Sequence, residues 1–150
     1  MYLVDTNVIS ESRKGQRADP GVVEFFRRAK NEVFLPVQVV GEMQSGIERL
    51  RRRGDIPQAN LLEKWFQTVL DDYSPHLIAF DLECAKIWGV LIGADEQHHI
   101  DKQIAAIALL RDLVVVTRNT SHFAGTGVPV MNPFLADRSP GPPVDRGGVQ

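Results

Sequence analysis

Short apolar runs alternate along the chain with longer stretches in which apolar residues recur every third or fourth position. The short runs predict buried strands at 2–4, 33–35, 77–79, 113–116 and 128–130. The periodic stretches predict helices that begin close to Pro20, Val37, Asp55, Asp81 and Asp101. This order of elements predicts an α/β fold with a mainly parallel sheet and right-handed crossovers.

The first predicted strand is followed at once by Asp5-Thr6-Asn7. In an open parallel sheet, ligands bind at the carboxyl ends of the strands, so Asp5 stands where chemistry usually takes place. Aspartate, threonine and asparagine also cap helices, and Val8 and Ile9 follow in a helical pattern. These residues alone support a functional carboxylate and a helix cap equally.

Two further acids lie near the beginnings of predicted helices. Glu42 borders the apolar face of the helix expected from Val37 to about Arg53. Taken alone, this position favours the interpretation of Glu42 as a solvent-facing helix residue. Gly46 follows one turn later, and glycine in a helix costs ~1 kcal/mol relative to alanine, which indicates a packing or access reason. Asp101 is placed as the cap of a helix that is apolar on nearly every side and is therefore expected to be buried.

Polar residues also follow the strongest predicted strand, Leu113–Val116, a β-branched run typical of a central parallel strand. Thr117, Arg118 and Asn119 come directly after it. Separated carboxylates that converge with such residues at the carboxyl edge of a sheet suit a hard Mg²⁺ or Mn²⁺ ion, which takes oxygen ligands and retains several waters. The adjacent pair His98-His99 is a weaker metal candidate, because neighbouring histidines are more often simply solvated.

Composition limits the classes of protein that remain. The chain has 150 residues and is 43% hydrophobic and 24% charged, which is typical of one globular domain. A net charge of -2 means that any nucleic-acid-binding surface must be local or assembled between subunits. The single cysteine, Cys84, excludes an internal disulfide and suits a reducing cytoplasm.

Two expectations concern location and domain limits. No apolar stretch approaches the ~18 residues of a membrane span, and Asp5 interrupts the N-terminus too early for a signal peptide, so we expect a cytoplasmic protein with no membrane contact. Residues 136–150 are rich in proline and glycine and have little to bury. We therefore expect a globular domain over 1–135 and a disordered tail over 136–150.

Four segments carry a resemblance to a known family, and they occur in that family's order: Asp5–Ser10, Gly41-Glu42, Asp101–Ala106 and Val116–Phe123. They resemble the PIN domain, and are most similar to the VapC- and FitB-type toxins of bacterial type II toxin–antitoxin pairs. The resemblance covers residues 1 to 135. Asp-Thr-Asn alone would not be specific, whereas the four segments together are.

The resemblance implies a three-layer α/β/α fold and a Mg²⁺- or Mn²⁺-dependent endoribonuclease. Such toxins are usually homodimers, and a small antitoxin inhibits them by inserting a peptide at the active site. The resemblance assigns Asp5, Glu42 and Asp101 as catalytic metal ligands. It assigns supporting roles to three polar residues, Thr6, Asn7 and Thr117.

The chain departs from the fullest PIN pattern at two positions. Asn119 stands where many members have a fourth acid, and His122 replaces an acid often found just before the phenylalanine. Three carboxylates already exceed the charge of one Mg²⁺, so we expect one firmly held ion and a second recruited with RNA phosphate, with Asn119 as an orienting member of the catalytic set. Arg118 could grip phosphate beside the site or be a surface arginine, and the arginines within 49–53 could line an RNA groove or be solvated.

Rival classes fit the sequence less well. A haloacid-dehalogenase-type phosphatase also begins with a strand that ends in aspartate, but it needs a second acid where this chain has Asn7. A nucleotide-binding module needs a glycine-rich phosphate loop after a strand, and none is present. The alternative that stays open is a catalytically weak PIN scaffold that binds RNA or a protein partner without cleavage, because of Asn119.

Overall fold

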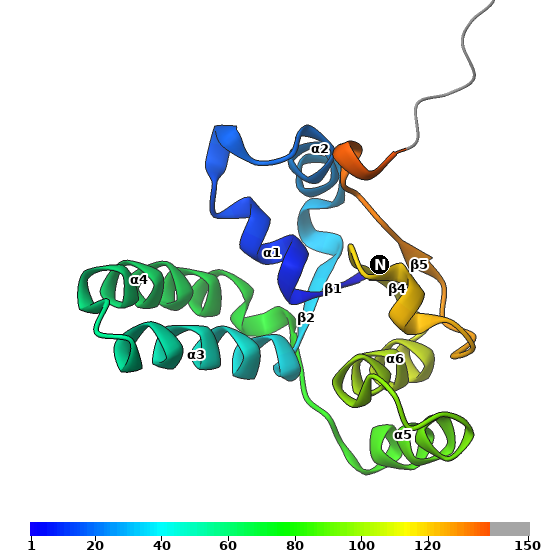
Figure 1. Ribbon diagram of the computed structural model, residues 1–150. Coiled ribbons are helices and arrows are strands. Elements are labelled where there is room, and N and C mark those ends of the chain that lie inside the picture. Colours follow the sequence, from blue (N-terminus) through cyan, green and yellow to red (C-terminus); the bar gives the residue numbers. More distant parts are fainter. Residues whose placement is uncertain (139–150) are drawn as a thin grey trace, which may run out of the picture.

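Five parallel strands form the centre of the protein, in the order β3-β2-β1-β4-β5 (Figure 1). The computed structural model describes residues 1–138. Its strands are β1 (Tyr2–Val4), β2 (Val33–Pro36), β3 (Leu77–Ile78), β4 (Val114–Val116) and β5 (Val130–Met131). Every pairing between neighbouring strands is parallel, which confirms the predicted sheet.

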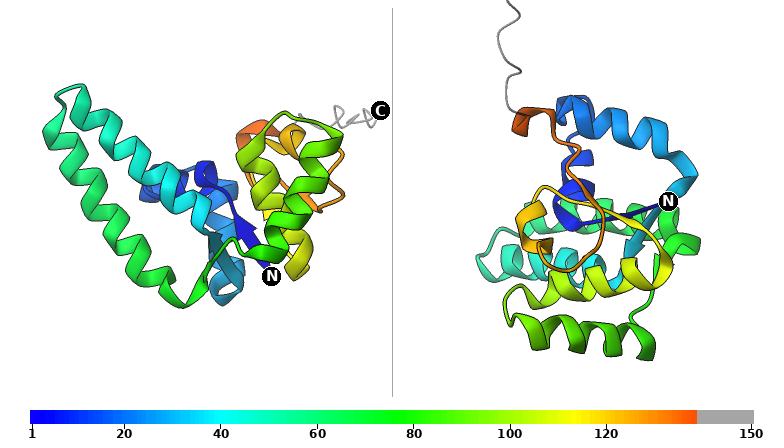
Figure 2. Two further views of the ribbon diagram at one scale, coloured as in Figure 1. Left: turned by 90° about the horizontal axis from the view of Figure 1, so that it is seen from below. Right: turned by 90° about the vertical axis from the view of Figure 1, so that its right-hand side faces the viewer.

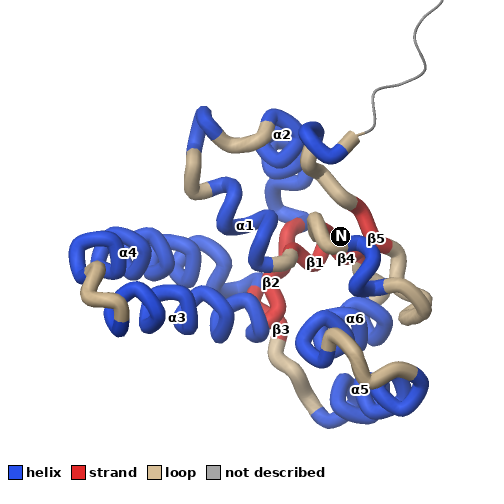
Figure 3. The backbone as a smooth tube through the Cα atoms, viewed as in Figure 1, coloured by secondary structure: helices blue, strands red, loops and turns tan. Residues whose placement is uncertain are grey.

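Helices follow most of the strands, as the alternating sequence pattern predicted (Figure 3). The α-helices of residues 1–138 are α1 (Thr6–Ser12), α2 (Pro20–Ala29), α3 (Val37–Arg52), α4 (Ile56–Tyr73), α5 (Leu82–Ala94) and α6 (His99–Arg111). The short 3₁₀ turns are η1 (Gly15–Arg17), η2 (Lys30–Glu32), η3 (Ser74–His76), η4 (Thr120–Phe123) and η5 (Leu135–Asp137). No helix within residues 1–138 is long and apolar enough to cross a membrane.

Each face of the sheet is covered by its own group of helices, which confirms the three-layer α/β/α arrangement. Val4 and Val116 pack into a core with α1 to α4, whereas Leu3 and Val115 pack into a second core with α5 and α6. Successive strand residues point to opposite faces, so the continuous apolar strands serve both cores. The hairpin of α3 and α4 projects to one side of the molecule, away from the paired helices α5 and α6 (Figure 2).

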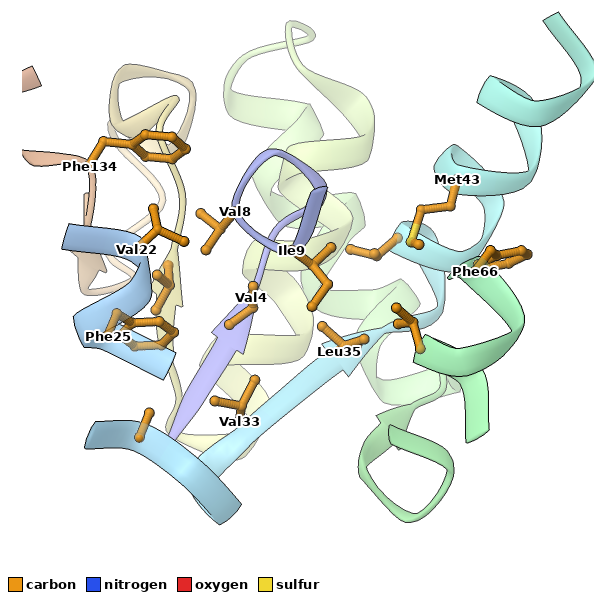
Figure 4. Packing of buried hydrophobic residues seen from close by; sticks show 14 of the residues in the cluster. Val4, Val8, Ile9, Val22, Phe25, Val33, Leu35, Met43, Phe66 and Phe134 are labelled. Carbon is orange, nitrogen blue, oxygen red and sulfur yellow. The ribbon is translucent and has the colours of Figure 1, made fainter. Parts of the chain in front are cut away.

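The larger core is closed by side chains from every element on its face (Figure 4). Val8 and Ile9 of α1 lie between Val22 of α2 and Met43 of α3, above the strand residue Leu35. Complete burial of an aliphatic side chain contributes roughly 1.5–3 kcal/mol. The second core combines large aliphatic side chains with small residues of α6. Three alanines of α6 (Ala105, Ala106 and Ala108) have no exposed surface, which confirms the predicted burial for the middle of this helix, whereas Leu109 and Leu110 at its end are exposed.

Several predicted boundaries were wrong for local reasons. Leu113 is not part of β4, because its N–H donates to the carbonyl of Ala108 and closes the end of α6. Pro129 has no N–H to donate, so β5 begins at Val130, although the Pro129 carbonyl still accepts a bond from Val115. The predicted strand at 77–79 ends at Ile78. β4 is an interior strand, but β1 occupies the middle of the sheet.

The beginning of α6 also differs from the prediction. Helix α6 starts at His99, and His98 is the cap residue, in a left-handed conformation with φ 55°. Asp101 therefore lies within the first turn and is not the cap. The hydrogen bond from the Lys102 N–H to the His98 carbonyl closes this turn at 2.9 Å. The carboxylate of Asp101 is thereby free for contacts outside its own helix.

The predicted tail begins with residues that contact the body of the protein. The N–H groups of Leu135, the last residue of the predicted domain, and of Ala136, the first of the predicted tail, donate to the carboxylate of Asp19 at 2.8 and 3.0 Å. Asp19 also caps α2, so one side chain joins η5 to that helix. The rest of the predicted tail, from 139 onward, lies outside the described residues.

Candidate active site

The strand order creates a crevice at the carboxyl ends of β1 and β4. From β1 the chain continues to β2 and β3 on one side of the sheet, and later returns to add β4 and β5 on the other side. Loops that leave two neighbouring strands in opposite directions open a gap, and open α/β sheets bind ligands there. Asp5 follows β1 and Thr117 follows β4, so both face this gap.

The hydroxyl of Thr117 joins the two loops. Thr117 has no exposed surface, and its Oγ1 donates to Asp5 Oδ2 at 2.9 Å. The same oxygen accepts from Asn7 Nδ2 at 3.3 Å and from the Asn119 N–H at 3.1 Å. Asn7 Oδ1 in turn accepts the Arg118 N–H at 2.9 Å. These bonds fix the Asp5 loop and the Asn119 loop relative to each other.

Asp5 is both a helix cap and a buried carboxylate at the crevice, so the two sequence interpretations describe one arrangement. Its Oδ1 accepts the Thr6 N–H at 2.8 Å at the start of α1, and its Oδ2 accepts Thr117. Only 3% of Asp5 is exposed. Burial raises the pKa of Asp5, and the nearby Asp101 charge raises it further, whereas the two hydrogen bonds oppose this rise.

The three predicted acids line one pocket of about 500 Å³. Asp5 comes from the end of β1, Glu42 from the second turn of α3, and Asp101 from the first turn of α6. Partial desolvation raises the pKa of Glu42, and the charges of Asp5 and Asp101 add to this effect. The structure thus places three mutually repelling carboxylates together. The remaining lining residues are Thr6, Asn7, His98, His99, Ile100, Asn119 and His122.

Arg118 does not line this pocket. Its guanidinium donates twice to the carboxylate of Asp137, at 2.9 Å for each bond, and lies 4.5 Å from the centre of the Phe134 ring. The side chain therefore joins the loop after β4 to η5. These contacts match the interpretation of Arg118 as a surface arginine and not as a residue that grips phosphate. The backbone N–H of Arg118 still supports the site through Asn7.

A second pocket, of about 490 Å³, adjoins the first and shares Glu42 with it. Arg49 lines this second pocket, whereas Arg51 of the same helix is paired with Glu48 and Glu63. Of the arginines within 49–53, only Arg49 borders either pocket of the described chain. A Cβ atom added at Gly46 would meet no atom within 4 Å, so close packing against the backbone does not explain that glycine.

Two histidines, His98 and His122, adjoin the acids. The sequence pointed to His98 only as half of an adjacent pair with His99, and to His122 only as a departure from the family motif. His122 Nδ1 lies 2.9 Å from Asp101 Oδ2, and the rings of His98 and His122 stack with centroids 3.9 Å apart. The presence of His122 within a motif was a signal for its position. The proximity of His98 to His122 had no signal in the sequence, because it depends on the left-handed turn before α6.

Comparison with known proteins places this geometry in a family. No protein-family model matches the chain. The plasmid stability protein StbB of Pseudomonas syringae is 33% identical over 91% of this chain and 100% of that protein. Toxin FitB of Neisseria gonorrhoeae is 30% identical, with coverage of 89% and 99%. The VapC ribonuclease Y4jK of Sinorhizobium fredii is also 30% identical, with coverage of 89% and 98%.

Solved structures agree with these relatives. The FitAcB structure from Neisseria gonorrhoeae has a TM-score of 0.76 and 31% identity, and the match covers 89% of this chain and 98% of that one. A toxin–antitoxin complex from Klebsiella pneumoniae shares the fold, with a TM-score of 0.68 and 21% identity, over 89% of this chain and 98% of that one. The fold and the acidic crevice define a PIN-like α/β/α protein. The chain belongs to the PIN-domain toxin family that contains FitB and the VapC ribonucleases, which confirms the resemblance drawn from its four segments.

Proposed function

We propose that the protein is a Mg²⁺-dependent endoribonuclease that acts in the cytoplasm as the toxin of a toxin–antitoxin pair. The observation that carries this proposal is the convergence of Asp5, Glu42 and Asp101 in one pocket, at the crevice between the carboxyl ends of β1 and β4. The names of two relatives, a toxin and a ribonuclease, support the biological role and the reaction class.

The residues of the pocket fit a hard divalent ion. Burial and mutual repulsion raise the pKa values of Asp5 and Glu42, so a bound cation would relieve an unfavourable arrangement of charge. Carboxylate oxygens are preferred ligands of Mg²⁺ and Mn²⁺. Asp5, Glu42 and Asp101 would hold the ion. When bound, it would supply stabilisation of negative charge on phosphate oxygens and activation of water.

The chain's own residues then set the geometry of cleavage. Thr117 and the Thr6 N–H fix the carboxylate of Asp5, so its orientation does not depend on substrate. Asn119 lines the pocket with a neutral amide, which can orient water or a phosphate oxygen without adding negative charge. Arg49 in the adjoining pocket offers a positive charge to the next phosphate of an RNA strand.

Two glutamates of α3 provide a matched test of the proposed activity. Glu42 lines the pocket, whereas Glu48 is paired with Arg51 on the same helix. Purified protein should cleave RNA with Mg²⁺ and not with EDTA. Glu42→Gln should lower the single-turnover rate by at least about 10²-fold, because one of three charged groups that hold the ion is lost, and Glu48→Gln should leave the rate unchanged. Mg²⁺-independent RNA binding without cleavage would instead establish the scaffold alternative.

We further propose that the working unit is a homodimer inhibited by a small antitoxin. A net charge of -2 equips one subunit poorly for RNA, whereas two subunits can align their Arg49 side chains. An arginine or lysine from the antitoxin would neutralise the three carboxylates through charge-assisted hydrogen bonds. We expect a dimeric mass by light scattering at micromolar concentration, and suppression of cleavage by the protein encoded next to the toxin. A monomeric mass contradicts the dimer, and a neighbour without effect contradicts the antitoxin.

Substitutions of Asn119 test whether this residue only orients. Asn119→Ala should slow cleavage roughly fivefold, because a single hydrogen bond is worth about 1 kcal/mol in net terms. Asn119→Asp adds a fourth carboxylate and should tighten binding of a second Mn²⁺ ion in the absence of RNA. Single-turnover rates and Mn²⁺ titrations measure these effects. If Asn119→Ala is as inactive as Asp5→Ala, Asn119 is a full member of the catalytic set.

A further inference from the structure

Two histidines, His98 and His122, form a cluster with Asp101, one of the three carboxylates of the pocket. His98, Asp101 and His122 come from the cap of α6, its first turn and η4. One potential ligand atom from each of these residues lies within 4.8 Å of the other two. The contacts already present are the 2.9 Å bond between His122 Nδ1 and Asp101 Oδ2 and the stacking of the two imidazole rings.

The fold holds His98 in this position. His98 has the left-handed φ of 55°, and its place three residues before Asp101 brings both side chains to the first turn of α6. The preceding loop is attached to α6 by Lys102, whose Nζ donates to Asp95 Oδ2 at 3.0 Å and to the Gln97 carbonyl. Lys102 is only 3% exposed, so this ammonium group is a fixed internal support of the loop.

Two imidazoles and one carboxylate select a different ion from three carboxylates. Imidazole nitrogen suits Zn²⁺, Co²⁺ and Ni²⁺, whereas Mg²⁺ prefers oxygen ligands. Zinc binds nitrogen and carboxylate oxygen at about 2.0–2.2 Å. The ligand atoms around one zinc ion therefore lie somewhat closer together than the 4.8 Å limit that holds for these three residues. The rings must tilt apart from their stack for each to direct a nitrogen at a shared ion. His98 is exposed and His122 is half-buried, which leaves room for that movement.

We propose that His98, Asp101 and His122 form a binding site for a divalent transition-metal ion of the zinc and cobalt class. The site is distinct in ligand chemistry from the Mg²⁺ site and shares Asp101 with it. An ion at this site places positive charge beside the acidic pocket and uses one of its three carboxylates, so it lowers the affinity for Mg²⁺. Only this inhibitory consequence rests on the proposed ribonuclease function.

A purely structural role of the histidine pair makes a different prediction. If the stack and the bond to Asp101 serve only to hold η4 against α6, replacing either histidine changes stability and leaves metal binding unaltered. His99 provides a matched control. It is the next residue in the chain, but its ring packs edge-on with Trp88, with ring centroids 6.2 Å apart, and it does not belong to the cluster.

Titration with Co²⁺, followed by visible absorption at about pH 7.5, where ordinary imidazoles are neutral, measures the site directly. Parent protein and His99→Ala should bind Co²⁺ with the same affinity and release it to Zn²⁺. His98→Ala and His122→Ala should each weaken Co²⁺ binding by at least about tenfold, because a nitrogen ligand is lost. His122→Gln retains a hydrogen-bonding side chain next to Asp101 and should weaken binding equally, even if His122→Ala folds poorly.

Asp5→Asn separates this proposal from the proposed function. The variant should keep Co²⁺ binding while it loses Mg²⁺ binding, and His98→Ala should show the reverse. In parent protein, Zn²⁺ should raise the Mg²⁺ concentration required for cleavage, and in His98→Ala this effect should be lost. Absence of Co²⁺ binding in the parent, or parental Co²⁺ affinity in His98→Ala, His122→Ala and His122→Gln, overturns the site. Co²⁺ binding without any ribonuclease activity supports the site and contradicts only the proposed function.

Discussion

Replacing Asp5 with asparagine is expected to lower the rate of RNA cleavage by about 10³-fold or more without loss of the fold, because the charge stabilisation supplied at a metal site is worth several kcal/mol. Asparagine also caps helices well, so the bond to the Thr6 N–H can persist. Single-turnover rates on one RNA at saturating Mg²⁺ measure the loss, and circular dichroism checks the fold.

Asp81 provides the matched control for this substitution. Like Asp5, it follows a strand and caps a helix, with its Oδ1 accepting the Cys84 N–H at 3.0 Å, but it does not line the pocket. Asp81→Asn should therefore retain the parental cleavage rate. Equal losses in the two variants would show that Asp5 acts only as a cap.

The same substitution should change the pH dependence of stability. The pKa of Asp5 is raised in the folded protein above its ordinary value of 3.8. Protonated Asp5 therefore favours the folded state. This contribution to stability is fully present below pH 3.8 and is lost as the pH rises through the folded pKa. Without metal, Asp5→Asn should therefore gain stability relative to the parent as pH rises. Carboxylates that do not interact with Asp5, such as Glu24 with a pKa lowered to about 2 by Arg27 and Arg28, are common to both proteins and cancel.

Thermal unfolding in EDTA and in Mg²⁺ measures this effect. In EDTA at neutral pH, Asp5→Asn should unfold at a temperature equal to or above that of the parent. Mg²⁺ should stabilise the parent and leave the variant unchanged, because binding to the folded state alone raises stability. A variant that is less stable than the parent at every pH would indicate that the Asp5 hydrogen bonds outweigh charge repulsion.

The second large effect is expected at Thr117. Thr117→Val keeps the shape of the side chain but removes the hydroxyl that contacts Asp5, Asn7 and the Asn119 N–H. Leaving buried polar groups unpaired should lower the free energy of unfolding by about 2–3 kcal/mol. Misplacement of the Asp5 carboxylate should also slow cleavage by roughly 10²-fold. Denaturant unfolding and single-turnover kinetics measure the two effects separately.

Thr117→Ser distinguishes the hydroxyl from the rest of the side chain. Serine retains the donor and acceptor oxygen and loses one buried methyl group, so its stability should fall by only about 1 kcal/mol. Cleavage should remain close to the parental rate. If Thr117→Val is as stable and as active as Thr117→Ser, the hydrogen bonds of Thr117 do not organise the site.

Local sequence patterns predicted the strands and the polar residues that follow them, but could not predict which strands are neighbours. Asp5 and Thr117 are 112 positions apart, and their contact depends on β1 lying next to β4. The resemblance to PIN-domain toxins supplied the grouping of Asp5, Glu42 and Asp101 that spacing alone left open. The structure places these three side chains in one pocket, and their role as metal ligands is our proposal.

The errors arose where a local backbone conformation overrode the pattern. A left-handed residue at His98 starts α6 two residues before Asp101, and a second one at Asp112 allows the Leu113 N–H to close that helix. Non-glycine residues adopt this conformation rarely, so hydrophobic periodicity does not reveal it. The first of these turns also positions His98, and for that reason the histidine cluster could not be predicted from spacing.

Calorimetric titration of metal-free protein with Mg²⁺ tests most directly whether Asp5, Glu42 and Asp101 together hold a divalent ion. Mg²⁺ is the suitable probe because it avoids imidazole ligands and so reports on the carboxylates. We expect the parent to bind one Mg²⁺ ion, and Asp5→Asn, Glu42→Gln and Asp101→Asn each to bind it at least about tenfold more weakly, because affinity depends on the number of charged ligands. Parental Mg²⁺ affinity in all three variants would contradict the proposed metal site.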